Sequence, residues 1–86
     1  MTHADVVIYQ YNFWVQRFQF DINAMRENQT PPTTFLFASD KLRDEVAKHL
    51  HSLAEFAYAG GEGDLAHQIN CAAFELHSDG VPPMPM

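Results

Sequence analysis

Residues 5–25 are the most strongly patterned stretch of the chain, and they hold the only Trp and half of the Phe and Tyr residues. Apolar and polar side chains alternate over residues 7–16, and they alternate again over 17–25 with reversed parity. Alternation at period 2 is typical of half-buried strands, and a change of parity indicates a turn or bulge between them. This pattern predicts two antiparallel strands, over residues 6–13 and 17–25.

The same stretch also carries a helical pattern. An apolar stripe at helical spacing is formed by Val7, Tyr11, Trp14, Val15, Phe18, Ile22 and Met25. A helix would leave a second apolar set on its opposite face, which a small domain can bury only by dimerising or by making the helix central; this set is Val6, Tyr9, Phe13 and Phe20. The β-branched and aromatic composition favours strands. However, residues 14–17 lack the Gly, Asp or Asn of a good hairpin turn.

Residues 33–38 (TTFLFA) follow two prolines and predict a third strand, because short β-branched and aromatic runs fit a sheet. Ser39 or Asp40 then caps a helix that extends to about Ala59. Its apolar stripe makes this helix the most strongly indicated element of the sequence.

Gly60 and Gly61 end that helix, and Asp64 is expected to cap a second helix over residues 65–77. The short GGEG connection makes the two helices antiparallel neighbours. The predicted fold is therefore α+β, with a three-stranded antiparallel sheet followed by an antiparallel helical hairpin, in the order β-β-β-α-α. The alternative is an all-α three-helix arrangement.

The 86 residues are expected to form a single small domain over residues 1–80. Residues 81–86 (VPPMPM) form a tail of Pro and Met that we expect to be flexible. The many aromatic residues leave more apolar surface than so short a chain can bury. The sequence therefore also predicts a homodimer, held by the aromatic stretch.

The formal net charge is −6, and it is unevenly distributed. Residues 49–86 contain five acids and no Lys or Arg, whereas residues 1–48 contain six acids and five bases. An acidic half repels nucleic acid and anionic membranes, so we expect neither direct nucleic-acid binding nor membrane binding. Its natural complement is a protein partner with a basic surface.

Cys71 is the only cysteine, so no disulfide can form within the chain, which suits a reducing cytoplasm. The first sixteen residues contain no Lys or Arg, so the positive region of a signal peptide is missing. The apolar stretch is interrupted by polar residues and is not expected to span a bilayer. These features predict a cytoplasmic protein.

His67 and Cys71 are four residues apart on the last predicted helix, a spacing that places two metal ligands on one face. They are weak candidates for a metal site, because a structural zinc needs four ligands and no CxxC or HxxxH motif supplies the others. Phe74 lies on the same face and has no obvious place in the core. No cofactor is predicted.

No catalytic motif is present in the chain. The glycines at 60–63 are followed by an acid, not by the Lys of a nucleotide-binding loop, and there is no GxSxG motif. His67 could deprotonate Cys71, but no third group orients the pair. We therefore expect a protein that is not an enzyme.

The leading hypothesis is a small acidic protein-binding module that acts as an inhibitor, adaptor or regulator of another protein. Small proteins encoded by phages and mobile elements often have this profile. The candidate partner-binding residues are Tyr9, Tyr11, Phe13, Trp14, His67, Cys71 and Phe74. Two alternatives remain open: an acidic mimic that blocks a nucleic-acid-binding protein, and a small metal-binding protein that uses His67 and Cys71.

Overall fold

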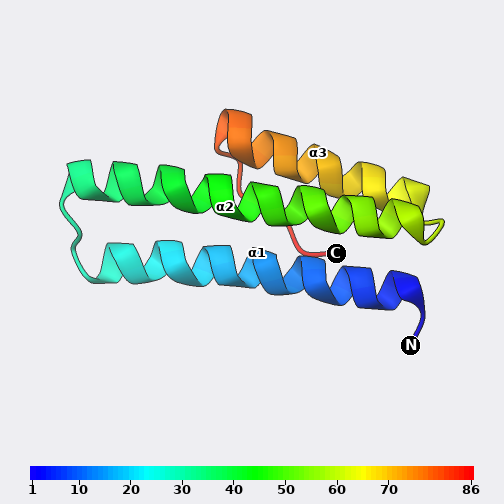
Figure 1. Cartoon of the computed structure of the whole chain (residues 1–86). Coiled ribbons are helices and arrows are strands. Elements are labelled where there is room, and N and C mark those ends of the chain that lie inside the picture. Colours follow the sequence, from blue (N-terminus) through cyan, green and yellow to red (C-terminus); the bar gives the residue numbers. More distant parts are fainter.

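The computed structural model describes all residues, 1–86, and contains three α-helices and no strand (Figure 1). The helices are α1 (His3–Glu27), α2 (Pro32–Ala59) and α3 (Gly63–Asp79). The predicted three-stranded sheet is therefore wrong, and the all-α alternative fits the structure. The helical hairpin of the main prediction is present, because α2 and α3 pack against each other along the length of α3.

Helix α1 occupies the stretch that we interpreted as two strands. One set of its apolar side chains forms a continuous stripe, whose buried members are Val7, Tyr11, Val15, Phe18 and Ile22. A capping box starts the helix: the Thr2 hydroxyl accepts from the Asp5 amide, and the Asp5 carboxylate accepts from the Thr2 amide, each at 3.1 Å. Strand propensity depends on packing context, and here a helix buries most of the stripe without needing a turn.

Helix α2 begins seven residues before the predicted cap at Ser39. Residues 33–38, predicted as a strand, form its first turns, and the Phe35 amide donates to the Pro31 carbonyl at 2.8 Å. Proline suits a first turn because its amide would have no helical partner there and its φ is already helical. Ser39 is a buried residue within α2 and not its cap, and its hydroxyl donates to the Leu36 carbonyl at 3.1 Å.

The turn between α2 and α3 uses Gly61 at φ 86°, a conformation that residues with a Cβ rarely adopt. Asp64 lies in the first turn of α3 but makes no capping hydrogen bond, and Glu62 occupies the cap position. At the other end Gly80 takes the left-handed conformation, and its amide donates to the Leu76 carbonyl at 3.2 Å. This turn directs the chain out of the helix and into the tail.

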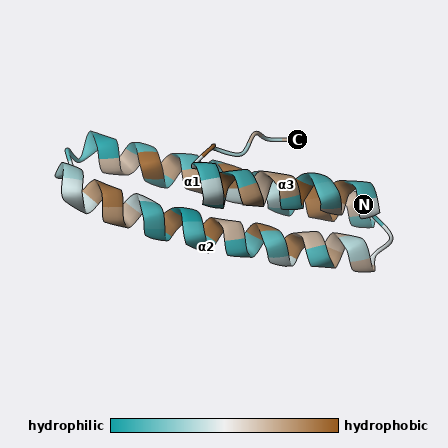
Figure 2. Ribbon diagram, turned by 90° about the horizontal axis from the view of Figure 1, so that it is seen from above, coloured by the Kyte–Doolittle hydropathy of each residue, from teal (hydrophilic) through white to brown (hydrophobic).

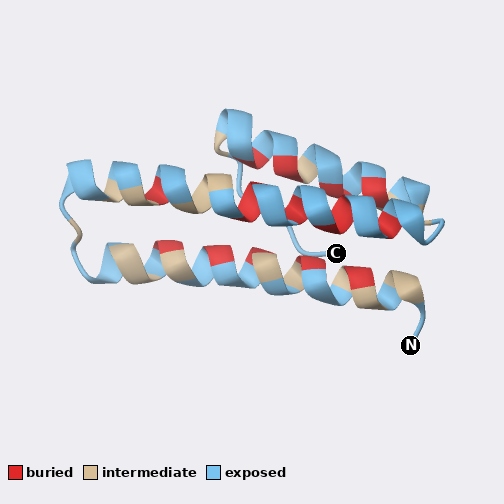
Figure 3. Ribbon diagram, in the orientation of Figure 1, coloured by how far each residue is buried: buried red, intermediate tan, exposed pale blue.

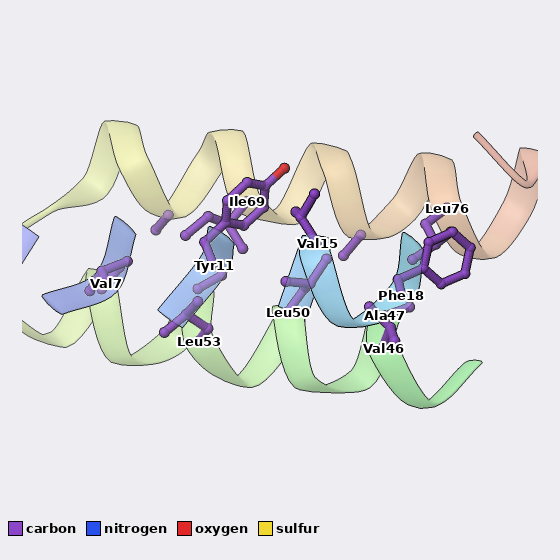
Figure 4. Packing of buried hydrophobic residues seen from close by; sticks show 14 of the residues in the cluster. Val7, Tyr11, Val15, Phe18, Val46, Ala47, Leu50, Leu53, Ile69 and Leu76 are labelled. Carbon is purple, nitrogen blue, oxygen red and sulfur yellow. The ribbon is translucent and has the colours of Figure 1, made fainter. Parts of the chain in front are cut away.

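The core lies between the three helices, and its centre is formed by Leu50 of α2 with Ile69 and Leu76 of α3 (Figure 4). Val7 and Tyr11 of α1 complete it, and all five side chains are almost wholly buried. Where α2 meets α3, small side chains allow close approach of the two backbones; they are Ala47, Ala54, Ala57, Ala66 and Ala73.

The molecule is long and flat, with extents of 44 × 24 × 15 Å. Hydrophobic residues occur on outward-facing turns as well as at the helix interfaces (Figure 2). Helix α3 is shorter than its neighbours and covers only the half of the α1–α2 pair that lies away from their connection (Figures 1 and 3). No helix combines the length and apolar content that crossing a bilayer requires.

Candidate interaction surfaces

Three aromatic side chains form an outer aromatic stripe on α1, which we define as Tyr9, Phe13 and Phe20. Their exposed fractions are 70%, 48% and 71%. At 100° per residue these positions lie within a narrow arc, and the buried stripe lies on the opposite side of the helix. The stripe therefore contributes little to the core and presents apolar rings to solvent.

Tyr11 and Trp14, two other candidate residues, lie on the inner side of α1. Tyr11 is only 2% exposed. The Trp14 ring is partly buried and stacks on His49 of α2, with centroids 4.0 Å apart and planes inclined by 10°. The structure thus separates the aromatic candidates of α1 into an exposed pair, Tyr9 and Phe13, and an inner pair that holds α1 to the rest of the fold.

The tail, residues 81–86, runs back along α1. The Tyr11 hydroxyl donates to the Met84 carbonyl at 2.8 Å. The Asn12 amide group makes two further bonds to Met86, accepting from its amide at 2.8 Å and donating to its carbonyl at 3.1 Å. Pro83, which precedes Met84, is buried. These contacts give the tail a defined position beside α1, and its flexibility stays a prediction.

Burial raises the pKa of the Tyr11 phenol above its ordinary value, and the Glu75 carboxylate raises it further. Both effects disfavour the phenolate, the first by removing water and the second by repulsion between like charges. The hydroxyl is thereby kept as a donor for the Met84 carbonyl.

We expect the free energy of unfolding to fall as the pH rises above about 10, the ordinary pKa of a phenol. In that range the folded protein holds the Tyr11 proton more tightly than the unfolded chain does, so deprotonation favours unfolding; below it the contribution is complete. Tyr11→Phe should lower the free energy of unfolding at neutral pH by about 0.5–1.5 kcal/mol. Above pH 10, the free energy of unfolding of this variant should fall less steeply than that of the wild type. Urea titrations of both proteins test this, and parallel pH profiles would contradict it.

The second candidate surface is the outward face of α3. The Cys71 Sγ lies 3.6 Å from the His67 Nε2, and Phe74 is 62% exposed nearby. These three residues line a shallow hollow of about 370 Å³ together with His51, Asn70 and Glu75. The sequence spacing thus correctly brought the thiol and the imidazole together on one face.

The structure contains no group of three or more His, Cys, Asp or Glu side chains that could hold a metal ion. The other histidines needed to complete a site at Cys71 have other neighbours: His51 bonds Asn70 at 2.9 Å, and His77 lies 3.5 Å from Asp44. His49 stacks on Trp14. A four-ligand site that uses the thiol would therefore need ligands from outside the chain.

The net charge is confined to the part of the molecule in which three helices pack together. Residues 1–16 and 49–86, which lie side by side in the fold, carry six acids and no Lys or Arg. Residues 17–48 carry five acids and five bases, so this part is neutral. Tyr9 and Phe13 belong to the acidic part, and Phe20 belongs to the neutral part.

Leu36 and Phe37 are among the exposed apolar residues that were missed as surface candidates, because the strand interpretation of residues 33–38 placed these two in a sheet. The outer aromatic stripe was visible in the sequence only under the helical interpretation. Comparison of the chain with protein-family models, with curated proteins and with solved structures gave no match.

Proposed function

We propose that the protein is a non-catalytic protein-binding module that holds a basic protein partner against Tyr9 and Phe13, as an inhibitor, adaptor or regulator of that partner. The observation that carries the proposal is the exposure of these two aromatic rings on a helix whose opposite face forms the core. Folding gains little from rings in this position, and aromatic side chains are enriched among the residues that dominate binding energy.

The Phe13 ring is supported by packed aromatic rings. The Phe13 ring meets the Trp14 ring edge-on, with centroids 5.4 Å apart, and Trp14 is in turn stacked on His49. A ring held on a packed helix loses little conformational freedom on binding, so more of its contact energy remains as affinity. Tyr9 adds a hydroxyl that can bond a polar group of the partner.

The tail enlarges this surface on one side. Asn12, which holds Met86, lines one small hollow with Tyr9 and Phe13. Met86 and Met84 are both exposed, and methionine adapts its shape to an apolar partner. The surrounding acidic charge favours a partner whose apolar contact lies among Lys and Arg residues, because complementary potentials speed association and exclude wrong partners.

The test is affinity purification from native lysate with a tagged chain, read by quantitative mass spectrometry. Replacing both Tyr9 and Phe13 with Ser should weaken retention of the partner about thirtyfold, the effect of losing one hot spot of about 2 kcal/mol. The double variant should keep its helical circular dichroism, because neither ring belongs to the core.

The matched control is Phe74→Ser, which removes an exposed ring from α3 and should leave retention unchanged. A partner that is lost with Phe74→Ser but kept by the double variant would move binding to the α3 surface. A partner that neither substitution affects would exclude both aromatic surfaces.

The confinement of all net charge to the three-helix part favours a second candidate, an acidic mimic of nucleic acid. Asp64, Glu75 and Asp79 are exposed along α3 and carry much of that charge. In this case the captured partner would itself bind DNA or RNA, and it would be released by nucleic acid and by moderate salt. Replacing the three acids with their amides would then abolish capture, whereas replacing Tyr9 and Phe13 would have little effect.

A further inference from the structure

The connection between α1 and α2 lies in a part of the molecule that only two helices form. We define this two-helix end as residues 18–27 of α1 and 32–42 of α2. Helix α2 has 28 residues and α3 has 17, so eleven residues of α2, or about 16 Å of helix, extend beyond the reach of α3. In Figure 3 the buried turns of α2 concentrate along α3 and become sparse toward the connection.

A groove of about 330 Å³ opens between the two helices at this end. Phe18 and Ile22 of α1 line it on one side, and Leu36 of α2 lines it on the other. Gly80 and Pro82 border it, where α3 ends and the tail turns away. The groove therefore continues the space that α3 fills farther along the pair, and another helix could pack there.

Leu36 is the clearest sign that this groove is unfilled, because the side chain is 58% exposed although it belongs to a helix with a well-buried stripe. An exposed Leu beside an open groove with Phe18, Ile22 and Phe35 in its lining extends the apolar surface there, and exposed apolar patches mark sites of association.

The charges of the two-helix end can complement those of the same surface on a second copy. Asp21 and Asp40 of this end pair within the chain, with Arg17 and Arg43 respectively. The remaining charges of the two-helix end make no ion pair within the chain and are of both signs: Arg26, Lys41 and Glu27. The three-helix part carries most of the net negative charge, since residues 1–16 and 49–86 contain six acids and no Lys or Arg, so it would repel a second copy of itself.

From this geometry we infer that the two-helix end is the contact surface of a homodimer, in which two copies lay their grooves on each other around a twofold axis. Each copy contributes α1 and α2, and the four segments form a short antiparallel four-helix bundle. Leu36 of each copy is covered by the other, over the groove that Phe18 and Ile22 line. The two acidic parts then point to opposite poles of the dimer, where their repulsion is smallest.

The lengths of the parts agree with this arrangement. In a symmetric dimer, each copy covers the two-helix end of the other with its own two-helix end. The covered and covering stretches therefore have the same length. Helix α3 of each copy ends where the other copy would begin, because Gly80 turns the chain away from the groove. The dimer surface is also separate from Tyr9 and Phe13, so it is independent of the proposed function.

Sedimentation equilibrium across micromolar concentrations tests the inference. The wild-type chain should sediment as a dimer, and Leu36→Glu should raise the dissociation constant at least about 100-fold, because two unpaired carboxylates would be desolvated at the contact. Leu36 is exposed in the single chain, so this variant should fold, as circular dichroism would verify. Phe13→Ser, on the outer aromatic stripe, is the control and should leave the dissociation constant unchanged.

Amide NMR spectra recorded during dilution locate the contact independently of any substitution. The shifts should change at residues 18–43 and remain constant around Tyr9 and Phe13. A monomer at every concentration would overturn the inference. So would a dimer that survives Leu36→Glu but dissociates with Phe13→Ser, since this result would place the contact on the outer aromatic stripe.

Discussion

Replacing Leu50 with Ala is expected to lower the free energy of unfolding by about 2–5 kcal/mol. Leu50 is wholly buried, and its side chain lies where α2 meets both other helices (Figure 4). The truncation removes apolar contacts with α1 and α3 together and leaves a cavity that helices on two sides cannot close. A domain this small has a total stability of only about 5–15 kcal/mol, so the loss should lower the melting temperature strongly.

The matched control is Leu36→Ala, the same truncation at an exposed position of the same helix. Its cost should stay below about 0.5 kcal/mol when measured by urea unfolding of dilute protein, where self-association does not contribute. Similar costs at the two positions would contradict the assignment of Leu50 to the centre of the core.

Enlarging Ala57 to Leu should cost about 1–3 kcal/mol or more, for the opposite reason. Ala57 is wholly buried near the C-terminal end of α2, where its carbonyl also accepts from the Gly60 and Glu62 amides at 3.1 and 2.9 Å. The added carbons would have to separate helices that pack closely because their contact side chains are small. The turn into α3 would be displaced as well.

Ala59→Leu makes the same chemical change two residues away, at an exposed position of α2. Alanine and leucine have similar helix propensities, so this variant should unfold within about 0.5 kcal/mol of the wild type. Thermal unfolding followed at the helical circular dichroism band compares the two. If Ala57→Leu were as stable as Ala59→Leu, the close contact at Ala57 would be excluded.

The sequence predicted the second half of the fold well and the first half poorly, for an identifiable reason. In α2 and α3 the apolar residues form one stripe each, and glycines mark both helix ends, so the helical hairpin could be derived. In α1 the aromatic residues occur on both faces, which produces the alternation of strands. Tyr9 and Phe13 create that alternation, yet they are surface residues and contribute nothing to the core.

Two local signals could have decided for the helix. One was the missing turn residue near Trp14, and the other was the Thr2–Asp5 capping box, which the structure contains. The start of α2 was harder to predict, because β-branched and aromatic residues at 33–37 prefer strands. That preference amounts to only tenths of a kcal/mol per residue, and packing of Phe35 on the core overrides it.

The candidate surfaces were predictable only in part. Phe74 and the His67–Cys71 pair could be placed on one face of a helix from their spacing. The groove at the two-helix end could not, because its existence depends on where α3 stops relative to the α1–α2 connection. The position of the groove depends on the lengths of all three helices together, and no short sequence motif indicates it.

Because α3 stops at Gly80, resistance to local unfolding should differ between the two ends of the molecule. The helical turns next to the α1–α2 connection bury few side chains and can open while the core around Leu50 and Ile69 stays closed. A ligand that packs on those turns must first select the ordered fraction of molecules and then holds them ordered. Binding at the two-helix end would thus reduce the local unfolding of its helical turns, without changing the mean structure of the three-helix part.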